Sequence, residues 1–271
     1  MDNVLTHLLA EGRPLVMGIL NITPDSFSDG GRFDAPERAL AQARHMIAAG
    51  ADIIDIGAES TRPYGGMKAV DAEEELARLA PVLPQVVALG TPVSIDTMKA
   101  VVADWAIGQG AAIANDVWGL HRDPEMAGVV ARHGVPVVAM HNRDEIDPAI
   151  DILADMDAFF ERTLAIGEDA GIERSRIVLD PGIGFGKTPQ QSITTLARLD
   201  HFAHFGLPIL VGASRKRFIS SITPSEPSQR IGGSLASHLL AVESGAAIVR
   251  VHDVPETVQA LRVAAAIRGA R

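Results

Sequence analysis

The chain has 271 residues, a formal net charge of −10 and no cysteine. The lack of cysteine excludes disulfides, thiolate catalysis and zinc or iron–sulfur centres held by cysteine. The acidic balance argues against nucleic acid as a partner, because its phosphates dominate such binding and would be repelled. Hydrophobic residues make up 47% of the chain and aromatic residues only 4%, so the core must be mainly aliphatic, which suits helices packed on a parallel sheet.

The N-terminal segment and the hydropathy predict a cytoplasmic protein with no membrane association. The first residues, MDNVLTHLLAEGRP, carry an early acidic residue and no basic region ahead of a long apolar run, so they make a poor secretory signal. A membrane-spanning helix would need about 18 uninterrupted apolar residues, and the sequence contains no such stretch.

Short apolar runs rich in β-branched residues alternate with longer stretches of helical period. The expected strands are LVMGIL (15–20), DIIDIG (52–57), PVSID (92–96), AIAND (112–116), PVVAMH (136–141), RIVLD (176–180), PILVGAS (208–214) and AIVRVHD (247–253). The expected helices span about 36–50, 71–89, 98–109, 124–133, 153–170, 189–205, 230–244 and 254–268. Tight glycine junctions such as AAGAD and HFGLP join helices to strands. The pattern predicts an α/β fold, a single-domain (βα)8 TIM barrel over residues 1–271, with a doubly wound sheet as the alternative.

In such a barrel the functional residues belong at the carboxyl ends of the strands. The first strand is followed by NITPDSFSDGG, which contains Asn21 and Phe27 and is longer than the roughly 2 to 6 residues usual at this position. The second strand is followed by AESTRPYGG, which presents Thr61, Arg62 and Pro63. Long polar loops of this kind are typical of binding loops.

Acidic and amide side chains end three further strands, at Asp96, Asn115 and Asp180, and Asp116 follows Asn115. Each can either cap the following helix or bind a ligand. Several carboxylates at one barrel mouth would repel one another unless a ligand or metal donates to them. A carboxylate can accept two parallel N–H bonds from an amino-pyrimidinone edge, so this sector suits a flat heterocycle. Asp55 lies inside the second strand and is interpreted as facing the barrel interior.

Basic residues gather at the ends of the last two strands. The run GASRKRF places Lys216 directly after the seventh strand, where alternation would turn at least one of the three cations inward. In VRVHDV, Arg250 and His252 lie two residues apart and therefore on one face of the eighth strand. Together with Arg62 they form a cationic sector suited to pyrophosphate, whose oxygens arginine binds bidentately. The implied ligand is a heterocycle joined to a diphosphate.

The segment DPGIGFGKT, residues 180–188, resembles a phosphate-binding P-loop. Its first glycine position is occupied by Pro181, which has no N–H to donate to a phosphate. We therefore expect no nucleotide site in this loop, and we expect Lys187 and Thr188 only to begin the next helix.

Seven motifs in chain order resemble those of the dihydropteroate synthase family. They lie between residues 14 and 267 and read MGILNITPDSFSDGG, GADIIDIGAESTRP, SIDT, NDV, DPGIGFGKT, SRKRF and RVHDV. The resemblance implies a (βα)8 barrel that joins 6-hydroxymethyl-7,8-dihydropterin diphosphate to 4-aminobenzoate, releasing pyrophosphate, in folate synthesis. It further implies a homodimer that is a target of sulfonamides.

The resemblance also implies a role for individual residues. Pterin-binding positions are Asp96, Asn115, Asp180 and Lys216. Diphosphate-binding positions are Asn21, as a ligand of Mg²⁺, with Thr61, Arg62, Arg250 and His252. Positions that frame 4-aminobenzoate are Phe27, Pro63, Phe185, Ser214 and Arg217. The catalytic set would be Asn21, Arg62, Lys216, Arg250 and His252.

Two departures from the family pattern leave questions open. After the fifth strand the family usually continues Met-His-Met/Gln-Gly-x-Pro, whereas this chain has MHNRDEIDPAI, so the path of the loop is undefined; many members also carry Asn where this chain has Ser192. Two alternatives remain. A methyltetrahydrofolate-dependent corrinoid methyltransferase would have no diphosphate to bind, and a non-catalytic pterin-binding paralogue could lose the cations without harm.

Overall fold

The computed structural model describes residues 3–22, 35–59 and 70–270, and it confirms the expected barrel. Its parallel strands are β1 (Leu15–Asn21), β2 (Ile53–Gly57), β3 (Val93–Asp96), β4 (Ile113–Asp116), β5 (Val137–Met140), β6 (Ile177–Asp180), β7 (Leu210–Val211) and β8 (Ile248–Val251). They form one eight-stranded sheet in the order β6-β5-β4-β3-β2-β1-β8-β7. A parallel bridge between Leu179 and Ile209 joins the two edge strands, so the sheet closes on itself rather than lying open as a doubly wound sheet.

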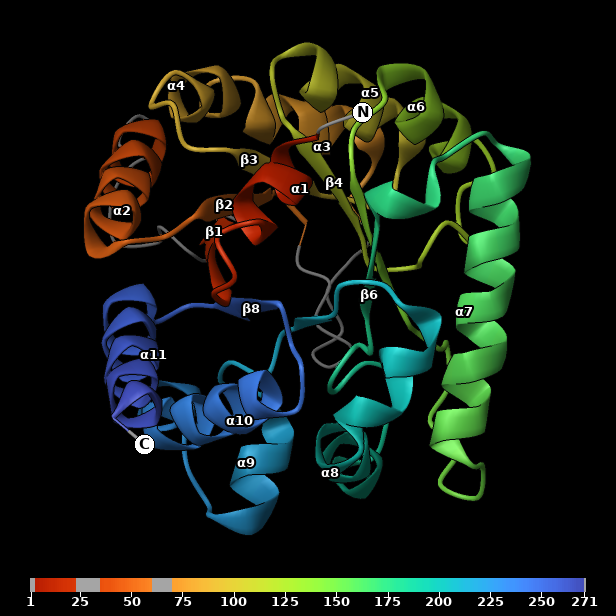
Figure 1. Cartoon of the computed structure of the whole chain (residues 1–271). Helices are drawn as coiled ribbons and strands as arrows, with labels where there is room; N and C mark the ends of the chain where they lie inside the picture. The colour runs from red at the N-terminus through yellow and green to blue at the C-terminus, as the bar shows by residue number, and fades with distance from the viewer. Residues whose placement is uncertain (1–2, 23–34, 60–69, 271) are drawn as a thin grey trace.

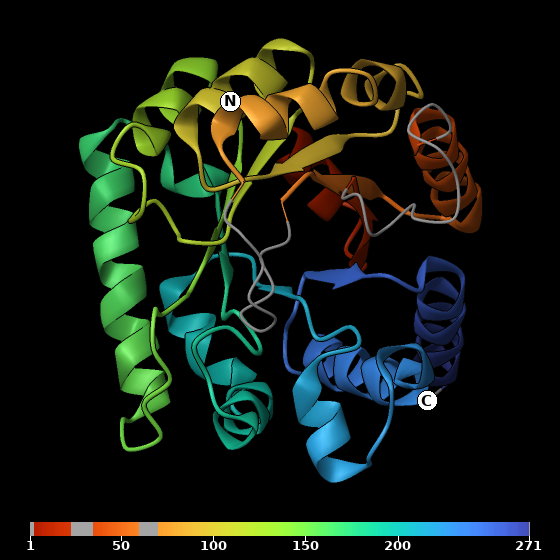
Figure 2. The ribbon, with the colours of Figure 1, turned by 180° about the vertical axis from the view of Figure 1, so that it is seen from behind.

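A ring of helices covers the outside of the barrel (Figures 1 and 2). The helices are α1 (Val4–Leu9), α2 (Ala35–Ala49), α3 (Ala72–Leu79), α4 (Leu83–Val87), α5 (Ala100–Gly108), α6 (Met126–His133), α7 (Ile152–Asp169), α8 (Pro189–Ala197), α9 (Arg217–Ile222), α10 (Ile231–Glu243) and α11 (Val254–Gly269). Short 3₁₀ helices are η2 (Arg174–Arg176), η3 (Leu199–Phe205) and η4 (Pro227–Gln229). Within the described ranges no helix has the length and apolar character needed to cross a bilayer.

Three expected elements differ from the structure. The helix expected over 71–89 is divided into α3 and α4, because Pro81 and Pro84 lack the N–H that a continuous helix needs. The helix expected over 189–205 ends at Ala197 and continues as the 3₁₀ helix η3. The strand expected over 208–214 is only two residues long, since the N–H of Ala213 donates to the buried ring of His238 (3.3 Å) instead of to a neighbouring strand. Helix α1 was not predicted.

Side chains that point into the barrel follow the period of two of the strands. A hydrophobic floor fills the amino-terminal half of the interior and consists of Leu15, Met17, Ile53, Ile113, Val138, Val178, Leu210 and Ile248, with Leu5 of α1 packed against it. Polar side chains occupy the next inward positions along four of these strands, at Asp55, Asn115, Asp180 and Arg250. The same alternation therefore builds an apolar floor and, two residues later, a polar mouth.

Helix α1 closes the floor from the amino-terminal end of the barrel, and Figure 1 shows it across the near ends of the strands. It begins at Asn3, whose side chain accepts the N–H of Thr6 at 3.0 Å as an N-cap. Leu5 points into the barrel and is buried, with Val4, Leu8 and Leu9 packed beside it. The helix serves as a plug that keeps water from the inner layer.

We expect Leu5→Ala to lower the free energy of unfolding by about 2 kcal/mol, since it opens a cavity above the floor. Thr6→Ala in the same helix is the matched control, because that side chain is exposed and its loss should cost under about 0.5 kcal/mol. Urea unfolding measures both. Equal effects of the two variants would show that α1 does not plug the barrel.

Candidate active site

Arg250 lies at the centre of the barrel mouth. Its Nε donates to Oδ2 of Asp55 at 2.6 Å, and its Nη2 donates to Oδ2 of Asp96. Asn115 extends this network, since its Nδ2 donates to both carboxylate oxygens of Asp55 at 3.2 Å. One guanidinium from β8 thus compensates two buried carboxylates from β2 and β3. Asp55 had been given no role from the sequence, although a carboxylate on the inner face of a buried strand is a signal for one.

Burial acts in opposite directions on the pKa of Asp96 and on that of Arg250. Burial raises the pKa of Asp96 to about 7, although Arg250 acts in the opposite direction. Burial alone would lower the pKa of Arg250, but the charges of Asp55 and Asp96 outweigh it and the net direction is upward, so the guanidinium stays charged. Oδ1 of Asp96 is buried and has no hydrogen-bond partner among the described residues. A buried acceptor without a partner is a position that a ligand with N–H donors would satisfy.

Asp180, Lys216 and Phe185 form the side of the mouth built by β6 and the segment after β7. Oδ1 of Asp180 accepts the N–H of Gly182 at 2.7 Å, and burial raises the pKa of this carboxyl against the effect of that bond. Nζ of Lys216 lies 3.9 Å from the centre of the Phe185 ring, a cation–π contact. Phe185 also packs with Val117 and Met140, which gives this side an apolar wall.

His252 and Ser214 meet beside Arg250. The hydroxyl of Ser214 lies 3.2 Å from the backbone N of His252, from which it accepts, and 3.0 Å from Nδ1 of the ring. Burial and the neighbouring cations Arg250, Arg215 and Lys216 lower the pKa of His252 to about 3, so the ring is neutral. The expectation that His252 adds to the cationic sector was therefore wrong. When the hydroxyl donates its proton to Nδ1, the ring proton sits on Nε2 and makes His252 an uncharged donor.

The basic run after β7 does not alternate as a strand would. Arg215 has a positive φ of 58° and pairs through Nε with Asp253 at 3.0 Å. Arg217 is exposed at the first residue of α9. The alternation argument for this run was wrong because β7 ends at Val211, yet Lys216 does face the mouth as expected.

Asp116 is a structural residue rather than a ligand-binding one. Its carboxylate accepts the N–H groups of Trp118 (2.9 Å) and Leu120 (2.7 Å), which closes the turn after β4. Leu120 has a positive φ of 72°, and the bond to Asp116 holds it there. The expectation that Asp116 caps the following helix is wrong, because α6 begins only at Met126 and the carboxylate closes the turn before it.

Several predicted site residues, namely Phe27, Thr61, Arg62 and Pro63, lie outside the described residues. Asn21 is described: it ends β1, half-buried, in register with Gly57. The ends of the undescribed segment 60–69 meet, because Oε1 of Glu59 accepts the N–H of Val70 at 3.1 Å. Lys99 binds the other oxygen of Glu59 at 2.5 Å.

The fifth loop, whose path the sequence left open, crosses directly over the glycine loop. Asn142 donates from Nδ2 to the carbonyl of Val117 at 3.1 Å and accepts the N–H of Arg143. A Cβ on Gly186 would lie only 2.5 Å from Cβ of Arg143, so the two loops are in close contact. Ser192, the other departure, is buried in α8 and donates to the carbonyl of Thr188.

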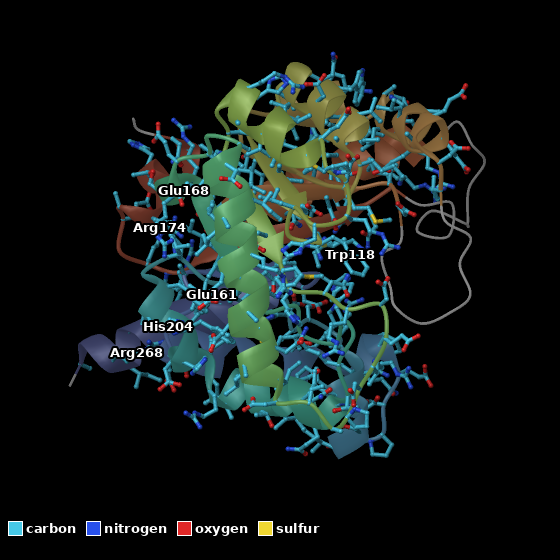
Figure 3. The ribbon with its side chains drawn as sticks, turned by 90° about the vertical axis from the view of Figure 1, so that its right-hand side faces the viewer. Trp118, Glu161, Glu168, Arg174, His204 and Arg268 are labelled. Carbon is cyan, nitrogen blue, oxygen red and sulfur yellow. The ribbon has the colours of Figure 1, made fainter. Side chains whose placement is uncertain are left out.

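Two other features of the described part lie outside the barrel mouth. Asp157 of α7 and His201 and His204 of η3 bring their ligand atoms within 4.8 Å of one another, and Figure 3 labels His204 beside α7. A nitrogen-rich set of this kind suits transition metals better than Mg²⁺.

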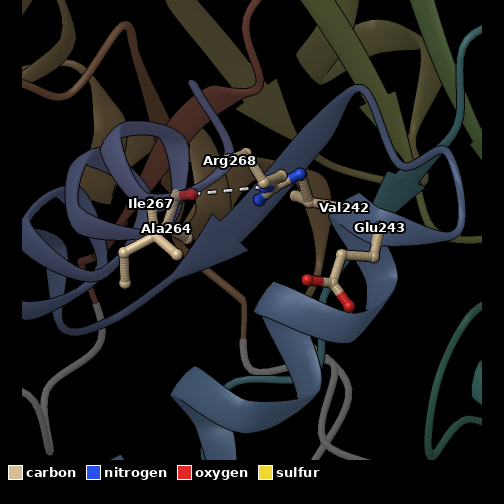
Figure 4. Close-up of a pocket in the computed structure, with 5 residues that line it drawn as sticks. All are labelled: Val242, Glu243, Ala264, Ile267 and Arg268. Carbon is tan, nitrogen blue, oxygen red and sulfur yellow. Dashed lines mark hydrogen bonds between the residues drawn. The ribbon is translucent and has the colours of Figure 1, made fainter. Parts of the chain in front are cut away.

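A pocket on the outer surface between α10 and α11 is lined by Val242, Glu243, Ala264, Ile267 and Arg268 (Figure 4). It contains none of the predicted site residues, so the barrel mouth remains the candidate active site.

Comparison with known proteins agrees with this geometry. The family described as "Pterin binding enzyme" matches residues 17–252. The dihydropteroate synthase of Bacillus subtilis is 47% identical over 245 residues, which are 90% of this chain and 85% of that protein. The dihydropteroate synthase of Escherichia coli is 44% identical over 265 residues, 95% of this chain and 93% of that protein. The solved structure of Xanthomonas albilineans dihydropteroate synthase with 7,8-dihydropteroate is 44% identical, has a TM-score of 0.87 and covers 94% of each chain. The chain therefore belongs to the pterin-binding enzyme family and, within it, to the dihydropteroate synthases.

Proposed function

We propose that the barrel mouth joins the methylene carbon of 6-hydroxymethyl-7,8-dihydropterin diphosphate to the amine of 4-aminobenzoate and releases pyrophosphate. The observation that carries this proposal is the sharing of Arg250 between Asp55 and Asp96, which leaves Oδ1 of Asp96 without a partner among the described residues. A corrinoid methyltransferase would have no use for the cations beside it. A non-catalytic paralogue is the remaining alternative.

The pterin is assigned to Asp96, Asn115, Asp180 and Lys216. Asp96 and Asp180 come from β3 and β6 and present buried carboxylates. The amino-pyrimidinone edge of a pterin carries N–H donors, which suit the free oxygen of Asp96. Lys216 lies near both carboxylates and lowers the pKa of each, so it favours their ionised, accepting form.

The diphosphate is assigned to Arg250 and His252, with Thr61, Arg62 and Asn21. Nε2 of neutral His252 donates without adding charge, while Arg250 and Arg62 supply the positive charge. Asn21 offers a side-chain oxygen at the end of β1, and oxygen is the ligand that Mg²⁺ prefers. Mg²⁺ bound there with the substrate's phosphates would neutralise the leaving group.

The 4-aminobenzoate is assigned to the wall made by Phe185, with Phe27, Pro63, Ser214 and Arg217. In this assignment Arg217, exposed at the first residue of α9, would bind the carboxylate, and Phe185 would bound the aromatic ring of the substrate. Because the same position would accept a sulfonamide, this site is also the proposed sulfonamide target.

The amine of 4-aminobenzoate is a weak nucleophile that needs correct positioning more than activation, so we assign no Ser or Cys nucleophile. The dihydropterin ring stabilises the positive charge that develops as pyrophosphate leaves.

We further propose a homodimer that uses the outer faces of α10 and α11. Leu240, Val263 and Ile267 are large apolar residues there, each more than half exposed, and Ile267 lines the pocket between the two helices. Burial of such a patch against a second copy would remove apolar surface from water. A cytoplasmic location, expected from the N-terminal segment and the hydropathy of the sequence, is also part of the proposal.

Mixing the purified protein with Mg²⁺, the pterin diphosphate and 4-aminobenzoate should yield equal amounts of pyrophosphate and dihydropteroate.

His252→Ala should raise the KM for the pterin diphosphate roughly tenfold, because one hydrogen bond to a charged group is lost. Its affinity for a pterin without the diphosphate should be unchanged. His252 is a cleaner probe than Arg250, whose removal would also leave Asp55 and Asp96 uncompensated. Pterin binding without product would favour the non-catalytic alternative.

Asp96→Asn should weaken pterin binding by roughly 30-fold, because an acceptor becomes a donor that faces donors. The same variant should gain stability relative to the wild type as the pH rises from 5 to 8. The folded-state pKa of Asp96 is raised from 3.8 to about 7, so its contribution to stability is present at low pH and lost as the pH rises through 7. Asn cannot ionise, so residue 96 of the variant makes a contribution to stability that does not change with pH. Thermal unfolding at both pH values and calorimetry of pterin binding measure the two effects; a stability difference independent of pH would contradict this account.

Ile267→Glu should convert the dimer into monomers in light scattering after size exclusion, since it places a charge in the apolar patch. Ile222→Glu is the matched control, because Ile222 is equally exposed but ends α9. If Ile267→Glu remains a dimer and Ile222→Glu becomes a monomer, the interface does not lie on α10 and α11.

A further inference from the structure

Lys187 is a buried lysine that belongs to none of the residue sets assigned to the pterin, the diphosphate or 4-aminobenzoate. Burial lowers its pKa to about 7. Its side chain is about 1% exposed, and it follows the glycine loop that begins at Asp180. Nζ lies 2.8 Å from Nδ1 of His141, 2.9 Å from the carbonyl of Phe185 and 3.3 Å from the carbonyl of His141. These three acceptors match the three N–H donors of a lysine ammonium group.

His141 continues the network to the outer helices. Its Nε2 lies 3.0 Å from Oδ2 of Asp155 on α7, and Arg143 binds the same oxygen at 3.2 Å. Burial lowers the pKa of His141 to about 4, so the ring is neutral. The proton on Nε2 then donates to Asp155 and leaves the lone pair of Nδ1 for Lys187. Lys187 therefore connects the glycine loop to the end of β5 and, through His141, to α7.

Two bonds shape the glycine loop from within: the N–H of Gly182 donates to Asp180, and the N–H of Phe185 donates to the carbonyl of Gly182 at 3.0 Å. Gly182, Gly184 and Gly186 all have positive φ, and a Cβ on Gly182 would lie 2.0 Å from the carbonyl oxygen of His141. The loop thus lies flat on residues 141–143 without a strand ladder between them. The bonds from Lys187 to the carbonyls of Phe185 and His141 join the two segments across this contact.

Phe185 is the residue whose position depends most directly on this connection. Its carbonyl accepts from Lys187, and its ring is buried beneath Nζ of Lys216. The bond from Lys187 fixes the backbone of Phe185, and Lys216 covers one face of its ring. The ring therefore has little freedom to rotate. We propose that Lys187, acting with His141, is a positioning residue that holds Phe185 as a fixed wall for 4-aminobenzoate. This inference rests on the proposed assignment of Phe185 to that substrate.

The test is steady-state kinetics of Lys187→Met with both substrates. Methionine keeps much of the buried volume but cannot donate. We expect the KM for 4-aminobenzoate to rise roughly tenfold, the loss typical of a removed hydrogen bond from a charged donor. The KM for the pterin diphosphate should rise less than the KM for 4-aminobenzoate, because Lys187 makes no hydrogen bond to Asp180 or Asp96 and acts on Asp180 only through its charge, which lowers the pKa of that carboxyl.

Thr188→Ala is the control for a general loss of loop stability. Thr188 caps α8 by accepting the N–H of Gln191 at 3.0 Å, and it makes no bond across the two loops. This variant should lower the melting temperature and leave the ratio of the two KM values unchanged. If Lys187→Met behaves in the same way, its role is structural only and the inference is overturned.

A pair of His141 variants tests the proposal even if Lys187→Met does not fold. His141→Asn places an amide oxygen near the former Nδ1 and keeps an acceptor for Lys187, whereas His141→Phe offers none. We expect His141→Phe to reproduce the selective rise in KM and His141→Asn to stay close to the wild type. Equal KM values for 4-aminobenzoate in the two variants would contradict the role of this bond.

Phe185→Ala separates this inference from the assignment on which it rests. If Phe185→Ala leaves the KM for 4-aminobenzoate unchanged, the assignment of Phe185 fails. If Phe185→Ala raises that KM while Lys187→Met and His141→Phe do not, the assignment stands and the positioning role is refuted.

Discussion

The ion pairs of Arg250 with Asp55 and Asp96 are the interaction on which the barrel mouth depends. Two carboxylates this deeply buried would not both remain ionised without a cation between them, because burial favours the neutral acid. Arg250 contacts one oxygen of each and Asn115 contacts the other side of Asp55. Asp96 keeps one oxygen without a partner among the described residues, and burial raises its pKa to about 7 although Arg250 lowers it. A ligand rich in N–H donors would stabilise the ionised form. Recognition of a pterin and stability of the empty mouth are therefore linked through one guanidinium.

Strand alternation explains why this cluster could be placed from the sequence. Asn115, Asp180 and Arg250 each come two residues after a floor residue, so the same period of two that buries the floor turns them inward. Expected and observed strand boundaries differ by one or two residues except at β7, where the ring of His238 takes the N–H that a longer strand would use. Such a contact joins residues distant in the sequence and has no local pattern.

The glycine loop is a second case in which contacts between distant residues could not be predicted from the sequence. Pro181 was enough to reject a nucleotide site from the sequence alone. The role of Lys187 was not predictable, because its partner His141 lies on another strand, in the loop that departs from the family pattern. Asp55 was placed correctly as inward-facing, but its function became visible only when β8 was seen to bring Arg250 against it. The net charge of −10 was likewise no guide to the mouth, where cations from separate strands meet.

Calorimetry of pterin binding at pH 7, in buffers of different ionisation enthalpy, tests the central claim most directly. In the free protein Asp96, with a pKa of about 7, is close to half protonated, and a ligand that donates N–H groups to it favours the ionised form. Binding of a pterin without a diphosphate should therefore release about half a proton at pH 7, and this release should be absent in Asp96→Asn. Proton uptake, or the same release in wild type and variant, would contradict the account.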